Sequence, residues 1–303
     1  MTSPPLSVVV PTRDRADQLQ TALAALAASL RPDDQLIVVD SASRDARLIA
    51  RAAADAGARL VRCDLPGASH ARNAGWAAAV HDIVAFVDDD VVVDAGWAAG
   101  ISAAMADHPD VGFVTGRIEA PPESGTMTVA IKSGDQPAVI DRTTTGVLGH
   151  SASLAVRRAV LAEVGGFDEL LGAGARWRAA EDTDLFDRIL GAGHLGRYEA
   201  SVGATHEQWR RIRAWVGLQH SYGIGSGARL AKLWRTDRER WRRVFREDVV
   251  TWGVGQLPGE VARLDGYRAL GTALRLGGII RGFVTAIAVP VRHGHFTRRS
   301  SSS

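Results

Sequence analysis

The stretch that most constrains this chain is a run of five apolar residues, Ile83–Val87, that leads directly into three aspartates. A short apolar run bounded by polar residues is typical of a strand buried on both faces of a sheet. Asp88, Asp89 and Asp90 would then lie at its carboxyl end, where open α/β sheets bind ligands. Three adjacent carboxylates repel one another, so we expect a cation there, and oxygen donors suit Mg²⁺ or Mn²⁺. The alternative interpretation is a solvated acidic turn.

Further apolar runs precede this strand and alternate with helical patterns. Residues 6–10, 36–39 and 60–62 predict strands. The first of these is followed by an amphipathic segment with one apolar face, made of Leu19, Leu23, Leu26 and Leu30. Strands that alternate with helices of this length predict a parallel sheet joined by right-handed crossovers. The expected fold class is therefore α/β, with a mostly parallel central sheet flanked by helices.

The second part of the chain repeats the alternation after a break. Residues 117–148 are rich in Gly, Pro, Ser and Thr and have weak periodicity, which indicates loops. Residues 153–156 then predict a strand, and residues 157–164 predict a helix. A second amphipathic helix is expected to begin at Glu181, and His206 follows a short predicted strand.

Charge divides the chain into an acidic body and a basic extension. Residues 1–206 hold 18 Lys and Arg against 27 Asp and Glu, whereas residues 207–303 hold 18 against 7. Such an asymmetry predicts that the extension meets an anionic surface. With 303 residues, one large or two modest domains are possible, and we place the boundary after residue 206.

The extension interleaves aromatic and basic side chains. Trp209, Trp215, Trp234 and Trp241 alternate with eleven basic residues: Arg210, Arg211, Arg213, Arg229, Lys232, Arg235, Arg238, Arg240, Arg242, Arg243 and Arg246. This mixture predicts interfacial helices on anionic lipid, and the alternative is a solvated basic extension with tryptophans facing the core. Residues 277–291 are mostly apolar but too interrupted by charge to span a bilayer, so a re-entrant segment, an interfacial segment and a segment packed on the body are the alternatives. Nucleic acid is not an expected partner, because no recognised binding module accompanies the charge.

The cysteine count and the N-terminal residues indicate the cellular compartment in which we expect the protein. Cys63 is the only cysteine, which excludes an intrachain disulfide and a cysteine-rich zinc site. The first residues lack the basic start and apolar stretch of a signal peptide. We expect a cytoplasmic protein, peripheral on the inner face of the plasma membrane if the extension binds lipid.

Three polar positions outside the central strand have two interpretations each. Glu181 and Asp182 open a helix, where acidic residues are explained by the helix dipole alone. A lone histidine such as His206 is more often structural than a ligand. Arg72 lies in a small-residue segment and is either a surface arginine or reaches the ligand crevice. Local sequence alone leaves these alternatives open.

Seven motifs in order resemble those of the family-2, inverting, GT-A-fold glycosyltransferases. The first four are Val-Val-Val-Pro-Thr-Arg-Asp-Arg at 8–15, Val-Val-Asp-Ser-Ala-Ser-Arg-Asp at 38–45, Pro-Gly-Ala-Ser-His-Ala-Arg-Asn-Ala-Gly at 66–75 and Phe-Val-Asp-Asp-Asp at 86–90. The others are Ser-Leu-Ala-Val-Arg-Arg at 153–158, Gly-Gly-Phe-Asp-Glu at 165–169 and Glu-Asp-Thr-Asp-Leu at 181–185. The resemblance implies a nucleotide-sugar-binding half, about 1–115, and an acceptor and catalytic half, 116–206.

The resemblance also implies roles for residues in the first half. Asp40 would read the nucleotide base, helped by Arg72 and the backbone of residues 11–13, and Asp88 would contact the ribose. The implied donor-binding set is Pro11, Thr12, Arg13, Asp14, Asp40, Arg72, Asp88 and Asp89. Asp90, the last residue of the family's Asp-X-Asp motif, would bind Mn²⁺ or Mg²⁺ together with His206.

In the second half, the resemblance assigns Asp182 the role of general base that takes the proton of the acceptor hydroxyl. Inversion requires such a carboxylate on the face opposite the leaving nucleotide. Glu181 is its competitor, because adjacent residues cannot be ranked without geometry. Relatives often have Asn at the position of Ser153 and Gly at the position of Ala180. Both positions are expected near the acceptor side, so the acceptor is the feature that the resemblance specifies least.

The leading hypothesis is a metal-dependent inverting transfer of a sugar from a nucleotide diphosphate, with UDP favoured over dTDP or GDP. The expected acceptor is a lipid-linked or cell-envelope glycan, since the extension suggests a membrane surface. A sugar-nucleotide nucleotidyltransferase would need a glycine-rich, lysine-containing phosphate loop after the first strand, and residues 12–15 do not form one. A non-catalytic nucleotide-sugar-binding, membrane-tethered protein is the third hypothesis.

Overall fold

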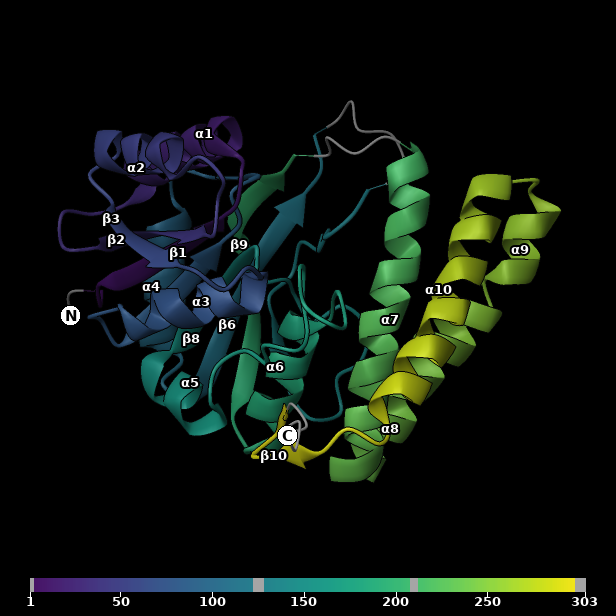
Figure 1. The fold of residues 1–303 in the computed structure, drawn as a ribbon. Coiled ribbons are helices and arrows are strands. Elements are labelled where there is room, and N and C mark those ends of the chain that lie inside the picture. The colour runs from purple at the N-terminus through teal and green to yellow at the C-terminus, as the bar shows by residue number, and fades with distance from the viewer. Residues whose placement is uncertain (1–2, 122–127, 208–211, 298–303) are drawn as a thin grey trace, which may run out of the picture.

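The computed structural model describes residues 3–121, 128–207 and 212–297. A central sheet carries helices on both faces, and a group of long C-terminal helices packs against one side of this body (Figure 1). The expected α/β class with a C-terminal helical region is confirmed. The division of the chain into domains stays a prediction.

The central sheet is mostly parallel. Its strands follow the order β3-β2-β1-β4-β8-β6-β9-β5, with β7 paired to β9. β8 runs antiparallel to both neighbours, and β5 and β7 run antiparallel to β9. The bounds are β1 Leu6–Thr12, β2 Gln35–Ser41, β3 Arg59–Cys63, β4 Ile83–Val87, β5 Val91–Val93, β6 Val111–Glu119, β7 Ala138–Ile140, β8 Ser153–Arg157 and β9 Leu195–His206. β10 (Val291–Arg292) and β11 (His295–Phe296) form a separate hairpin.

Helices of the body cover the two faces of the sheet. Alternate residues of β1 divide between two cores, since Val8 and Val10 pack on one face and Val9 on the other. The first face is covered by α1 (Ala16–Ser29), α2 (Ala46–Asp55) and α4 (Trp97–Asp107). The second is covered by α3 (Ala68–Ala77), α5 (Arg158–Val164) and α6 (Glu181–Gly191). The apolar runs at residues 6–10, 36–39 and 83–87 are therefore buried on both sides, whereas β3 at the edge of the sheet, which holds the run at 60–62, is largely exposed.

Several strands differ from the expectation, since β7 lies within the predicted loops of residues 117–148 and the hairpin of β10 and β11 was not predicted. The three valines after the aspartates form the short strand β5, which pairs with the end of β9. The strand before His206 is twelve residues long and ends at His206 itself. This pairing fixes the aspartates between two strands, and it brings His206 opposite Val91.

The C-terminal extension is helical. It comprises α7 Ile212–Thr236, α8 Arg238–Val244, a wider π-helical segment η2 Phe245–Val254, α9 Leu257–Ala262 and α10 Gly266–Ala286. α7 and α10 approach closely because glycines face each other. A Cβ added at Gly227 or Gly282 would lie 2.0 Å from a backbone oxygen of the opposite helix. Among the described residues, no helix is both long enough and apolar enough to cross a bilayer.

The basic residues of the extension are partly buried, which corrects the expectation that they face lipid or solvent. Lys232 Nζ lies 2.5 Å from Asp168 Oδ2 and 2.6 Å from Asp184 Oδ1. Arg229 and Arg240 both contact the carboxylate of Asp187. Helical spacing does not reveal such pairs, because the acidic partners lie on α6 and in the loop before it.

Phe296 of the C-terminal hairpin joins the same cluster. Its backbone N–H donates to Asp168 Oδ2 at 2.8 Å, and its ring packs against Trp177. Several predicted positions, namely Trp209, Arg210, Arg211 and residues 298–303, lie outside the described residues.

We predict that Lys232→Met lowers the free energy of unfolding by about 3–5 kcal/mol, because two buried carboxylates lose their cation. Urea unfolding measures the change. Arg51→Met is the control, since Arg51 is 80% exposed and its ion pair with Asp55 lies on the surface. A Lys232→Met variant no less stable than Arg51→Met would contradict the importance of the cluster.

Candidate functional site

The carboxyl ends of β1, β2 and β4 meet at one edge of the sheet. Thr12 of β1 pairs in register with Asp40 of β2, and β1 also pairs with β4, which ends just before Asp88. The sheet therefore gathers the predicted donor-binding residues at its carboxyl edge, which is the usual ligand position in such folds.

Asp89 is buried and held by two donors. Thr12 Oγ1 donates to Asp89 Oδ2 at 2.7 Å, and Arg15 Nη1 donates to Asp89 Oδ1 at 2.9 Å. Burial raises the pKa of Asp89 to about 6, although the Arg15 charge and the Thr12 hydroxyl oppose the shift. Asp89 thus fixes the end of β4 to the loop after β1.

Asp90 and His206 face each other through the pairing of β5 with β9. His206 Nε2 lies 3.4 Å from Asp90 Oδ1, and Arg15 Nη1 lies 3.3 Å from Asp90 Oδ2. Within the described ranges, no three His, Cys, Asp or Glu side chains are grouped closely enough to hold a metal ion. One carboxylate and one imidazole nevertheless fit a Mn²⁺ or Mg²⁺ site whose remaining ligands are substrate phosphates and waters.

Arg72 connects the end of β4 to the start of α6. Its Nη2 donates to Asp88 at 2.7 Å and its Nη1 donates to Glu181 at 3.1 Å. Burial would lower the pKa of Arg72, but the charges of Asp88 and Glu181 raise it, so the side chain is firmly cationic. Its buried Nε has no hydrogen-bond partner among the described residues. The surface-arginine alternative for Arg72 is therefore wrong.

Glu181 and Asp182 occupy the first turn of α6 and have different surroundings. Burial raises the pKa of Glu181, and the Arg72 charge opposes that shift. Burial alone would also raise the pKa of Asp182, but His150 and the Thr183 N–H lower it below its usual value. Asp182 Oδ2 lies 3.6 Å from His150 Nδ1, and Asp182 Oδ1 accepts from Thr183 N at 2.7 Å. The pKa values of the two carboxylates are thus shifted in opposite directions, and their partners differ.

The residues predicted to contact the nucleotide base lie close together, except that a different arginine contacts Asp40. Asp40 accepts from Ser43 N at 2.9 Å, and Ser43 Oγ accepts from Asp14 N, so the loops after β1 and β2 are tied. Pro11 is the β1 residue before Thr12, and Arg13 is half-exposed beside Asp14. The arginine that contacts Asp40 is Arg62, whereas Arg72 was expected to assist it.

Three residues of this region were not predicted as site residues: Arg15, Arg62 and His150. Arg62 lies opposite Asp40 in the register of β2 and β3, so only the strand alignment could have found it. Arg15 belongs to the first motif, but its reach to β4 depends on the sheet. His150 lies in a loop with no periodic signal.

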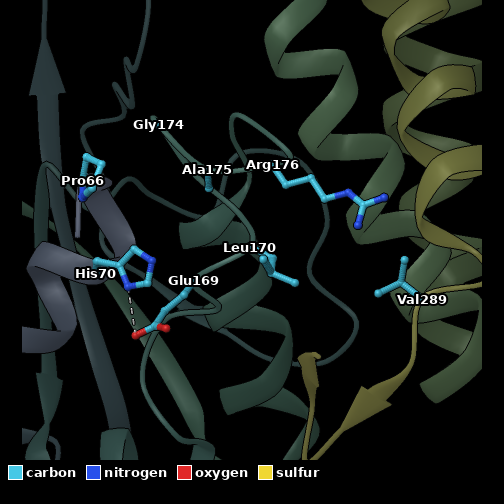
Figure 2. A pocket seen from close by; sticks show the side chains of 8 residues that line it. All are labelled: Pro66, His70, Glu169, Leu170, Gly174, Ala175, Arg176 and Val289. Carbon is cyan, nitrogen blue, oxygen red and sulfur yellow. Dashed lines mark ion pairs between the residues drawn. The ribbon is translucent and has the colours of Figure 1, made fainter. Parts of the chain in front are cut away.

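A separate cavity of about 410 Å³ opens between the start of α3, the loop at residues 169–176 and the extension (Figure 2). Its lining residues are Pro66, His70, Glu169, Leu170, Gly174, Ala175, Arg176 and Val289. His70 and Glu169 form an ion pair at 3.3 Å. The carboxylates at the carboxyl ends of β2 and β4 and in the first turn of α6 do not line this cavity, so it is separate from the edge of the sheet where they gather.

Comparison with known proteins finds glycosyltransferases both among family models and among individual relatives. The family model described as "Glycosyl transferase family 2" matches residues 7–165. A pre-mycofactocin glycosyltransferase of Mycobacterium tuberculosis is 33% identical over 172 residues, which are 54% of this chain and 35% of that protein. The chain therefore corresponds to about a third of that relative. Glycosyltransferase AglE of Haloferax volcanii is 27% identical over 253 residues, covering 80% of this chain and 79% of the relative.

Solved structures share the fold at low sequence identity. Mannosyltransferase PcManGT from Pyrobaculum calidifontis, in complex with GDP-Man and Mn²⁺, has a TM-score of 0.67 at 19% identity, with 93% of this chain and 88% of that chain covered. S. aureus TarS 1–349 in complex with UDP-GlcNAc has a TM-score of 0.55 at 15% identity, with 93% and 90% covered. The likeness establishes the GT-A fold.

We predict that the stability of the protein relative to an Asp182→Asn variant falls as the pH drops below about 4. The folded-state pKa of Asp182 is lowered, so its charged form stabilises the fold above the unfolded-state pKa, and this contribution disappears as the carboxylate is protonated. Urea unfolding at a series of pH values measures the difference. Introducing His150→Gln into both the unchanged protein and the Asp182→Asn variant should reduce this stability difference. A stability difference that grows as the pH falls would contradict the assignment.

Proposed function

The chain belongs to glycosyl transferase family 2, and we propose that it transfers a sugar with inversion from a nucleoside diphosphate to a hydroxyl acceptor. The observation that carries this proposal is the Arg72 bridge, because it sets the first turn of α6 beside the carboxylates that end β4. Asp88 at the end of β4 and Glu181 in the first turn of α6 thus contact the same guanidinium from two different elements. Such a division suits donor binding on one side and proton removal on the other.

We assign proton removal to Asp182. Glu181 is paired with Arg72, whereas the ion pair of Asp182 Oδ2 in the described part of the chain is with His150 at 3.6 Å. Asp182 would take the acceptor proton as the acceptor oxygen forms a bond to the anomeric carbon. The bond from that carbon to the diphosphate oxygen breaks at the same time, and the nucleoside diphosphate leaves. Glu181 would keep Arg72 oriented toward Asp88.

Asp90 and His206 would hold a divalent ion in this proposal. When bound, the ion would offset the negative charge of the leaving diphosphate. A mannosyltransferase of the same fold was solved with Mn²⁺, and this supports the expectation of Mn²⁺ or Mg²⁺ without choosing between them. Asp89 and Thr12 would keep the β4 carboxylates in place as the donor binds.

The proposal also covers which nucleotide the donor carries and which class of acceptor receives the sugar. Structures of the same fold hold GDP-Man or UDP-GlcNAc, and we favour a UDP-sugar, with dTDP- and GDP-sugars as alternatives. Asp40, tied to Arg62 and Ser43, would contact the base. For the acceptor we propose a lipid-linked or cell-envelope glycan.

We predict that one class of nucleotide sugar raises the melting temperature in Mn²⁺ and fails to do so in EDTA. A donor at 100 times its Kd adds about 2.7 kcal/mol to the stability of the native state. Asp90→Asn should abolish the shift, whereas Asp82→Asn should keep it, because the Asp82 side chain is 98% exposed at the opposite end of β4. Stabilisation that persists in EDTA would count against a metal at Asp90.

We predict that Asp182→Asn lowers kcat by about 10²–10⁴-fold and leaves the donor-induced thermal shift intact. The measurement is release of nucleoside diphosphate with acceptor present. Glu181→Gln is the matched comparison and should chiefly weaken donor binding through Arg72. A larger loss of kcat in Glu181→Gln, at unchanged donor affinity, would transfer the role of base to Glu181.

A further inference from the structure

The outer side of the extension exposes many large apolar side chains. Of the seventeen such side chains that are exposed in the described chain, nine lie between residues 250 and 284. We name these nine the outer apolar face: Val250, Trp252, Val254, Val261, Leu264, Tyr267, Leu270, Ile280 and Val284. Their exposed fractions reach 59% for Trp252 and 91% for Leu264. Exposed apolar side chains concentrated in one stretch of the chain in this way point to an interaction surface, whereas singly scattered ones need no explanation.

α10 shows why this face needs a partner. Its inner side packs against α7 through Gly278, Ile279 and Gly282. A helix with one buried side normally presents polar residues on the other. The opposite side of α10 instead carries Leu270, Ile280 and Val284. α9 and α10 form the outer edge of the molecule in Figure 1, away from the sheet.

Positive charge exceeds negative charge around this face, because residues 242–284 hold seven arginines against four acidic residues, Glu247, Asp248, Glu260 and Asp265. Asp248 pairs with Arg229 at 3.4 Å, Glu260 accepts from Thr272, and Asp265 caps α10. Within the described part of this region, residues 242–284, five exposed arginines form no ion pair: Arg242, Arg246, Arg263, Arg275 and Arg281. The surface therefore offers apolar side chains together with uncompensated positive charge.

We propose that the outer apolar face binds the surface of a bilayer that contains anionic phospholipid. Apolar side chains would enter the boundary of the acyl chains, and the arginines would contact lipid phosphates. Trp252 and Tyr267 are the aromatic types that favour this boundary. The sequence prediction placed the membrane contact on the basic helices with their tryptophans and left open whether residues 277–291 are interfacial, whereas this proposal places the contact on η2, α9 and α10.

A second copy of the chain fits this face less well. In a two-fold symmetric dimer the same patch meets itself, which would bring unpaired arginines close to their own counterparts. Anionic lipid removes that repulsion. The proposal rests on the proposed function in one respect, namely that a lipid-borne acceptor would be delivered to the site. Figure 1 shows α9 at the same end of the molecule as the start of α7, which follows His206 in the chain.

The test is sedimentation of the full chain with vesicles of phosphatidylglycerol and phosphatidylcholine, compared with phosphatidylcholine alone. We expect binding to the anionic vesicles and at least about a tenfold loss of partitioning in the triple variant Trp252→Ser, Leu264→Ser, Tyr267→Ser. The matched control is Leu48→Ser, Leu65→Ser, Val80→Ser, three similarly exposed apolar residues of the body. The control should bind as the unchanged protein does.

Donor-induced thermal stabilisation of each variant separates this proposal from the proposed function. If the triple variant loses vesicle binding but keeps the donor-induced rise in melting temperature, the result supports the membrane proposal. This conclusion does not depend on whether the variant still transfers sugar. Equal vesicle binding by the triple variant, or no binding by the unchanged protein, overturns the proposal. A dimer in light scattering that the triple variant abolishes, without vesicle binding, would assign the face to self-association instead.

Discussion

Lys232 lies between two buried aspartates, and the position of α6 depends on that arrangement. Asp184 is two residues beyond Asp182, while Asp168 anchors the loop before α6 and the C-terminal hairpin. A buried cation with two carboxylates is costly to disrupt, because each partner left alone is an uncompensated charge. The extension therefore acts as part of the support for the first turn of α6.

In the candidate site, too, carboxylates are paired with cationic side chains of the same chain. Arg15 pairs with both Asp89 and Asp90, and Arg72 pairs with both Asp88 and Glu181, so each guanidinium offsets part of the charge of two carboxylates. Carboxylates at the ends of strands are thereby held in position before any ligand arrives. Preorganised charge of this kind lowers the cost of binding, since the groups need not be ordered again.

Much of the fold was predictable because its signals are local. The apolar runs before Pro11 and Asp88 identify buried strands, and the seven motifs lead to the correct family. The interpretation of the basic extension was less successful. Arg229, Lys232 and Arg240 were expected at a surface, but they pair with acids on α6 and the loop before it. A charge asymmetry between two parts of a chain can mean that the parts neutralise each other.

The sequence by itself determined the strand and helix types, the family and the cluster of carboxylates at the end of the central strand. These depend on periodicity and on residues adjacent in the chain. Only the tertiary structure decided that Arg62 contacts Asp40, that His150 faces Asp182 and that Arg72 joins Asp88 to Glu181. Those pairs depend on strand register and on packing between distant segments, and no local pattern encodes the partner of a charged side chain.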